Sequence, residues 1–389
     1  MRILVVTPTF LPAWGGAERL LLEVFSRLSR RHTIHLVAPH TPAAAVREPA
    51  AALMGSLPFT VSRYDEGIRG DTIRGRRFHQ GFVPPFDLAA VSAVAKETRA
   101  FGPDVLSVFY AIPMGLAGLA ARRRFHIPMV LSLVGRDLPG PATLPGWKFY
   151  VRHVSRAADA TTFISDYSRT ALLGKRGGGI VVGSGAQDYR AAPANTDQLR
   201  SQLGLERDAF VLFALQRLSI YKGVDVIIES MTHLKDLPCV LLIAGTGPDR
   251  PRLEAAIHES GLQDKVRLLG FVPEDDMARY WALADLFVFH SYYETFGMVL
   301  AEAMLAGKAV VSVRSTAIPE VVRDEQDGVL VEPGDAKALA GAIRRLVLDS
   351  ATRRAMGESG HTRAQQQFAW EPVARAYEAV FEDAIRSHR

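Results

Sequence analysis

Residues 286–313 read LFVFHSYYETFGMVLAEAMLAGKAVVSV, and this stretch decides the fold. An apolar run at 286–290 predicts a strand, an almost wholly apolar helix follows over 298–306, and a second apolar run at 309–313 predicts another strand. Strands that are apolar on both faces are typical of a parallel sheet covered by helices. The stretch therefore predicts an α/β fold.

The same alternation runs through the whole chain. Further strands are predicted at 3–7, 34–38, 105–109, 129–134, 161–165, 180–182, 210–215, 240–244, 266–269 and 328–331. A chain of 389 residues exceeds what one core usually organises. Because a segment rich in Gly, Ala, Ser and Pro at 183–193 separates the two series of strands, we predict two Rossmann-like domains, over 1–187 and 188–369. The last helical segment, from residue 370, could pack on either.

Composition excludes several classes of protein. The single cysteine, Cys239, rules out internal disulfides and lies beside an apolar run, which favours a buried structural thiol. The first residues read as a strand, and no run of about 18 apolar residues follows, so we expect a cytoplasmic protein. A net charge of +5 permits attraction to anionic substrates or an anionic membrane surface without requiring either.

Glu294 and Glu302 are the most informative residues of the second half. Glu302 lies inside the apolar helix, where a carboxylate is costly unless it is paired or hydrogen-bonded. A ribose or a hexose offers pairs of hydroxyl donors that an ionised carboxylate can accept. Singly, each glutamate is better explained by a structural role, Glu302 bonding a backbone group or an arginine and Glu294 lying in solvent. The two together with nearby cations favour a binding site.

Those cations and a helix N-terminus predict an anion site. In doubly wound sheets ligands bind beyond the carboxyl ends of the strands. Arg217 and Lys222 follow one predicted strand, and Gly245 follows the next. The start of the apolar helix adds backbone N–H groups, from Phe296, Gly297, Met298 and Val299. Together they would hold a diphosphate without a metal ion.

The first half contains two weaker motifs. Gly15 and Gly16 follow the first strand, where a helix should start, so they either let backbone approach a phosphate or simply form a turn. Asp137 follows the strand at 129–134 and is either a helix cap or an active-site carboxylate.

Clusters of arginine mark the same half. They are most often solvated surface, and the functional alternative is contact with an anionic acceptor or phospholipid headgroups. The cluster members are Arg63, Arg69, Arg74, Arg76, Arg77, Arg122, Arg123 and Arg124. Because few aromatic residues are interleaved with them, nucleic acid is a poor candidate partner.

Other chemistries lack their motifs. The turn Gly245-Thr246-Gly247-Pro248 does not have the G-x-G-x-x-G spacing of a dinucleotide site. No His, Cys or Asp cluster has metal-ligand spacing, and no G-x-S-x-G elbow is present. We therefore expect no nicotinamide cofactor, no metal and no serine-hydrolase activity.

The residues described above resemble those of a known family, the retaining glycosyltransferases of family 4, whose hallmark is an E-x7-E motif. Glu294 and Glu302 have that spacing. The resemblance extends over the second half and reaches the Gly15-Gly16 turn. It includes the segments at 217–223, 270–273, 318–320, 327–328 and 368–370.

The resemblance implies a fold and a division of labour. The family has the GT-B fold, in which two Rossmann-like domains face each other across a cleft and the C-terminal helix, here 370–389, crosses back to the first domain. The first domain would bind the acceptor and the second the nucleotide sugar.

The resemblance also implies roles for single residues. Glu302 would hold the ribose hydroxyls and Glu294 the donor sugar, while Arg217 and Lys222 would clamp the diphosphate. The remaining assignments place Phe271 and Val272 in the base pocket, Gly16 on the phosphates, and Asp137 among the catalytic residues.

The sequence departs from the family pattern at three places. Val134 occupies a position where many relatives have histidine. The segment Ser184-Gly185-Ala186-Gln187 replaces Asn-Gly-Val-Asp, and Thr316-Ala317 replaces a frequent Gly-Gly pair. These changes bear on the donor sugar and the acceptor rather than on the fold.

The leading hypothesis is a retaining, metal-independent hexosyltransferase. It would use a UDP- or GDP-sugar and a glycan, lipid-linked or small-molecule acceptor, with a possible peripheral contact with an anionic membrane. The alternatives are a GT-B sugar-nucleotide epimerase and a non-catalytic nucleotide-sugar-binding subunit.

Overall fold

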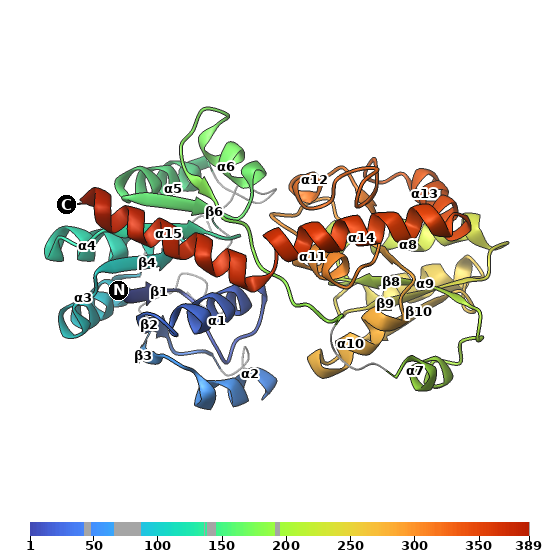
Figure 1. The fold of residues 1–389 in the computed structure, drawn as a ribbon, viewed down its shortest axis with the longest axis horizontal. Coiled ribbons are helices and arrows are strands. Elements are labelled where there is room, and N and C mark those ends of the chain that lie inside the picture. The colour runs from blue at the N-terminus through green and yellow to red at the C-terminus, as the bar shows by residue number, and fades with distance from the viewer. Residues whose placement is uncertain (43–47, 66–86, 136, 138–144, 191–194, 389) are drawn as a thin grey trace. The chain divides into compact units, whose positions relative to one another are not determined.

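The computed structural model describes residues 1–42, 48–65, 87–135, 137, 145–190 and 195–388 (Figure 1). They form two compact α/β units. Unit 1 comprises Met1–Ser184 and Trp370–Arg389, and unit 2 comprises Gly185–Ala369.

Unit 1 is built on a parallel sheet in the order β3-β2-β1-β4-β5-β6-β7. The strands are β1 (Arg2–Val6), β2 (Thr33–Pro39), β3 (Thr60–Tyr64), β4 (Val105–Phe109), β5 (Met129–Leu133), β6 (Ala160–Phe163) and β7 (Ile180–Val181). The helices are α1 (Gly16–Leu28), α2 (Glu48–Leu53), α3 (Leu88–Phe101), α4 (Gly115–Phe125), α5 (Pro145–Ala157), α6 (Asp166–Leu173) and α15 (Trp370–His388), with a 3-10 turn η2 (Met54–Ser56). The central strands β4 and β5 are buried along their whole length, as a sheet covered on both faces requires.

Unit 2 repeats this architecture with a parallel sheet in the order β10-β9-β8-β11-β12-β13. The strands are β8 (Phe210–Leu215), β9 (Cys239–Ala244), β10 (Val266–Gly270), β11 (Leu286–Val288), β12 (Val310–Val313) and β13 (Gly328–Val331). The helices are α7 (Thr196–Gln202), α8 (Val224–Met231), α9 (Arg250–Glu259), α10 (Glu274–Leu283), α11 (Met298–Leu305), α12 (Ile318–Val321), α13 (Ala336–Leu348) and α14 (Ser350–Gln367), with 3-10 turns η4 (Ile220–Lys222) and η5 (Thr232–Leu234). The predicted parallel α/β architecture is confirmed in both units.

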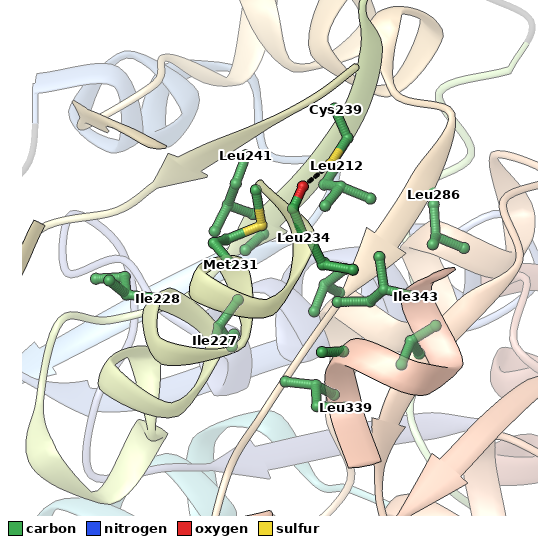
Figure 2. Close-up of a cluster of buried hydrophobic side chains, with 14 of the residues drawn as sticks. Leu212, Ile227, Ile228, Met231, Leu234, Cys239, Leu241, Leu286, Leu339 and Ile343 are labelled. Carbon is green, nitrogen blue, oxygen red and sulfur yellow. Dashed lines mark hydrogen bonds between the residues drawn. The ribbon is translucent and has the colours of Figure 1, made fainter. Parts of the chain in front are cut away.

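A core of unit 2 packs α8 and α13 against the sheet (Figure 2). Strand side chains meet helix side chains there, among them Leu212, Leu241 and Leu286 from the sheet and Ile227, Met231, Leu339 and Ile343 from the helices. Cys239 belongs to this cluster, and burial raises the pKa of its thiol. The prediction of a buried structural cysteine is therefore confirmed.

Helix α15 packs on unit 1, where it lies against α1, β4 and β5 (Figure 1). The rings of Phe25 and Phe381 lie 6.4 Å apart between centroids, and Nε2 of His32 is 2.6 Å from Oε1 of Glu378. The sequence alone left the packing partner of α15 open. Aromatic burial and polar bonds of this kind identify it as unit 1.

Asp159 is expected to make unit 1 less stable in acid. Burial raises the pKa of Asp159, but its bonds to Arg122, the Met129 amide and His388 outweigh burial and lower the pKa to about 2. A lowered folded-state pKa gives stability that is present above about pH 4 and is lost as the pH falls towards 2, here about 2 kcal/mol. Urea unfolding between pH 4 and pH 2 should show this loss in the wild type. The loss should be smaller by that amount in Asp159→Asn, and equal losses would contradict the assignment.

Candidate functional site

The loops after β8, β9 and β10 are joined by backbone hydrogen bonds at the carboxyl edge of the unit 2 sheet. The Leu218 N–H donates to the Thr246 carbonyl at 3.0 Å, and the Gly245 N–H donates to the Gly270 carbonyl at 2.8 Å. A Cβ on Gly245 would lie 1.9 Å from the Gln216 carbonyl oxygen, and Gly245 has a φ of 136°. Glycine is therefore required here for the close approach of two loops, whether or not a ligand binds.

Arg217 is an exposed cation at this edge, directly after β8. Its guanidinium makes no hydrogen bond or ion pair with any residue in the described ranges. An exposed guanidinium with five unused donors is available for a phosphate.

Lys222 and Glu294 form an ion pair between Nζ and Oε1. Lys222 ends the turn η4 after β8, and Glu294 lies in the loop between β11 and α11. Their side chains are 26% and 14% exposed, so the pair is partly shielded from water. The structure thus brings together two predicted site residues that are 72 positions apart in sequence.

Thr316 fixes the backbone of Glu294 and was not predicted as a functional residue. The Glu294 N–H donates to Oγ1 of Thr316 at 2.8 Å, and this hydroxyl donates to the Glu294 carbonyl at 2.8 Å. Thr316 has a φ of 46°, which lies in the left-handed region that favours glycine. The Thr-Ala departure from a frequent Gly-Gly pair was the sequence signal at this position.

The N-terminus of α11 directly follows the loop that carries Glu294. Gly297 precedes the helix with a φ of 90° and offers no side-chain cap, so the first-turn amides lack a capping oxygen from that residue. The ring of Phe296 packs edge-on against Phe368 at 5.5 Å, which leaves only the backbone of Phe296 for a ligand. Glu302 is 5% exposed inside α11, so its predicted burial is confirmed.

Phe271 and Val272 follow β10 on the neighbouring loop. The Phe271 side chain is 71% exposed, which is unusual for a phenylalanine in a folded unit. An exposed aromatic face beside Gly270 can stack on a planar ring.

Unit 1 carries the Gly15-Gly16 turn and Asp137 on its own sheet edge. Helix α1 begins at Gly16, as predicted, and a Cβ on Gly15 would lie 2.9 Å from Oε2 of Glu18. Asp137 is 1% exposed, and its Oδ1 accepts a hydrogen bond from the Ile112 N–H at 3.0 Å. The segment at 138–144 lies outside the described residues, so the choice between a helix cap and an active-site carboxylate stays a prediction; the bond of Asp137 within the described residues is to the loop after β4.

The arginine clusters are partly occupied by structural bonds. Arg63 donates to the carbonyls of Pro39 and Leu11, and burial lowers its pKa. Arg122 is bonded to Asp159 at 2.6 Å. These two arginines are therefore not free for a phospholipid headgroup. Four others of the cluster lie outside the described residues, namely Arg69, Arg74, Arg76 and Arg77.

Two properties of the described residues bear on metal and membrane binding. No three His, Cys, Asp or Glu side chains in those ranges gather closely enough to hold a metal ion. None of the helices described there is both long and apolar enough to span a bilayer.

Two family models match the chain. The model described as Glycosyltransferase Family 4 matches residues 14–182, and the model described as Glycosyl transferases group 1 matches residues 195–363. One match covers most of unit 1 and the other most of unit 2.

Curated relatives align along nearly the full length. The chain is 26% identical over 388 residues to N-acetyl-alpha-D-glucosaminyl L-malate synthase of Bacillus anthracis, covering 98% of this chain and 97% of that protein. It is 27% identical over 391 residues to a GDP-mannose-dependent alpha-(1-6)-phosphatidylinositol monomannoside mannosyltransferase of Mycobacterium tuberculosis, covering 96% of each.

Solved structures share the fold. HepE of Anabaena in complex with UDP and glucose has a TM-score of 0.78 at 23% identity, over 98% of this chain and 100% of that one. Sucrose-phosphate synthase of Thermosynechococcus elongatus has a TM-score of 0.78 at 21% identity, over 99% of each chain. At these identities the likeness concerns the fold alone.

Proposed function

We propose a reaction for this chain from the premise that it belongs to glycosyltransferase family 4 and has the GT-B fold. The enzyme transfers a hexose from a UDP- or GDP-sugar to a glycan, lipid-linked or small-molecule acceptor, with retention and without a metal ion. One observation carries the proposal. Arg217, without a partner among the described residues, lies at the same sheet edge as the Lys222–Glu294 pair and the N-terminus of α11.

The diphosphate is the group that this edge suits best. A guanidinium binds phosphate oxygens with two parallel donors, and an ammonium adds a point charge. The α11 N-terminus adds the positive end of a helix dipole. Negative charge develops on the departing diphosphate in the transition state, so these groups act as electrostatic catalysts.

Glu294 has two tasks in this scheme. Its carboxylate holds Lys222 in place through the ion pair. Its remaining acceptor capacity is directed to hydroxyls of the donor sugar. Glu302 takes the ribose hydroxyls, the exposed ring of Phe271 with Val272 takes the base, and Gly245 keeps the loops after β8 and β9 close.

Unit 1 supplies the acceptor side of the reaction. Gly15 and Gly16, at the start of α1, offer backbone amides to the phosphates, and Asp137 shapes the loop after β4. The names of two relatives place L-malate and a phosphatidylinositol monomannoside among family acceptors. Both small-molecule and lipid-linked acceptors are therefore worth screening for this chain.

A donor panel in EDTA tests the proposal. We expect the protein to turn over one UDP- or GDP-hexose with full activity in EDTA, because Arg217, Lys222 and the helix dipole supply the charge that a metal would otherwise supply. Glu294→Ala should lower kcat/KM about 100-fold or more. Nuclear magnetic resonance of the product should show the anomeric configuration of the donor.

Three outcomes would contradict the proposal. An epimerised sugar nucleotide formed without an acceptor would identify an epimerase. Donor binding by calorimetry with no turnover on any acceptor would identify a binding subunit. Unchanged turnover in Glu294→Ala would show that the active site does not lie at this sheet edge. Lys337→Ala, on the exposed start of α13, serves as the surface control.

A further inference from the structure

His290 is a buried histidine at the sheet edge that carries Lys222 and Glu294. It lies two residues beyond β11, and its side chain is 0% exposed. Because β11 and β8 are neighbouring strands, His290 stands beside the loop that follows β8. The reaction proposed above gives this residue no task.

One nitrogen of the ring holds a second loop. The Gly334 N–H, between β13 and α13, donates to Nε2 of His290 at 3.0 Å. Because Nε2 accepts, the proton of the neutral ring is on Nδ1. Burial lowers the pKa of His290 to about 4, against opposing effects of Asp225 and the Lys222 backbone, so the ring is neutral at pH 7.

The other nitrogen faces the turn that carries Lys222. A Cβ on Gly223 would lie 1.9 Å from Nδ1, and Gly223 has a φ of 56°. The glycine is therefore required both by its backbone conformation and by the ring packed on it. The Lys222 carbonyl also accepts a hydrogen bond from Nε2 of Gln216 at 3.0 Å, which is a second contact that holds the turn.

The ring also packs on its own loop, the one after β11. The ring of Tyr292 lies edge-on to His290, with 4.7 Å between centroids and 74° between planes. The Tyr292 N–H donates to the Tyr221 carbonyl at 3.0 Å, within the turn η4. His290, which lies in the loop after β11, thus contacts the loops after β8 and β13.

We propose that His290 is a positioning residue that holds the Lys222-Gly223 turn so that the Lys222 ammonium is aimed at the donor diphosphate. The proposal rests on the proposed function, in which Lys222 binds that group. A displacement of about 1 Å in a group that binds the reacting centre can cost on the order of 100-fold in rate. The catalytic benefit of a rigid turn therefore outweighs the cost of burying a polar ring.

Three substitutions separate the two ring nitrogens. His290→Asn keeps a donor near the position of Nδ1, facing the turn. His290→Gln keeps an acceptor near the position of Nε2, facing the Gly334 N–H. His290→Phe keeps the shape of the ring and loses both polar groups. The matched control is His361→Phe, which removes a ring bond to the Leu305 carbonyl at the opposite end of α11.

The expected results distinguish positioning from general stability. His290→Phe should raise the donor KM about 10-fold and leave the acceptor KM unchanged. His290→Gln should recover most of the donor affinity and His290→Asn less, because the ring is anchored by the bond between Nε2 and the Gly334 N–H, whereas Nδ1 has no hydrogen-bond partner among the described residues. Hydrogen exchange followed by mass spectrometry should show faster exchange over residues 219–225 in His290→Phe and wild-type exchange there in His361→Phe. The exchange experiment needs neither donor nor turnover.

Two results would overturn the proposal. One is unchanged exchange over 219–225 in His290→Phe. The other is faster exchange with an unchanged donor KM, which would give His290 a structural role only. If the wild type bound no UDP or GDP and turned over no donor, the proposed function would fail, and the exchange result would still decide whether His290 holds the turn.

Discussion

Lys222→Ala is expected to lower kcat/KM for the donor about 1,000-fold, at the upper end of what loss of one transition-state donor costs. The large effect has two sources. The substitution removes a cation from the diphosphate, and it leaves the Glu294 carboxylate, only 14% exposed, without its ion-pair partner. An unpaired carboxylate beside the phosphates repels them.

A double substitution separates these two sources. Lys222→Ala with Glu294→Gln removes the cation without leaving the repelling charge, so it should bind UDP or GDP about 10-fold more tightly than Lys222→Ala alone. Arg217→Ala should cost less than Lys222→Ala, because Arg217 leaves no anion behind among the described residues. Steady-state kinetics and calorimetry provide the measurements. Equal nucleotide affinity in Lys222→Ala and the double variant would contradict the role of the ion pair.

Asp327→Ala is expected to lower the free energy of unfolding of unit 2 by about 3–5 kcal/mol, because it leaves paired cations without their anion. Asp327 is 0% exposed. Its carboxylate accepts from the Arg323 Nη2 at 2.7 Å, from the Arg363 Nε at 2.9 Å and from the Ser359 hydroxyl at 3.0 Å. Burial raises the pKa of Asp327, but the bonds to Arg323 and Arg363 outweigh it and lower the pKa.

The control for this prediction is an exposed ion pair in the same unit. Asp236 pairs with Arg344 at 2.6 Å with side chains 62% and 36% exposed, so Asp236→Ala should lower the free energy of unfolding far less than Asp327→Ala. Urea unfolding of both variants, followed by circular dichroism, compares them directly. A loss for Asp327→Ala as small as that for Asp236→Ala would show that the buried Asp327 carboxylate and its bonds to the two arginines do not stabilise unit 2.

Most of the fold was predictable because its strands are buried on both faces. The apolar run at 286–290 contains β11, and the apolar helix proposed from residue 298 is α11. The strand β3 was missed because it lies at the sheet edge and its residues are half-exposed, so Thr60–Tyr64 has no continuous apolar run. Such an edge strand has a weak sequence pattern.

The candidate site was predictable only where topology decides it. Arg217, Lys222 and Glu294 were placed at one sheet edge because the carboxyl ends of parallel strands meet there. The Lys222–Glu294 ion pair was not predicted, since residues so far apart in sequence are paired only by the side-chain packing of the fold. His290 and Thr316 were missed for a related reason: their tasks depend on a ring packed on a glycine and on a left-handed backbone.

The central claim is that Arg217 and Lys222 bind the diphosphate of the donor. Calorimetric titration of the matched ligands UDP, UMP and uridine, or GDP, GMP and guanosine, tests it in the wild type and in Arg217→Ala and Lys222→Ala. In the wild type the diphosphate should bind at least about 10-fold more tightly than the monophosphate, and each substitution should reduce that ratio. A ratio that is the same in all three proteins would contradict the claim.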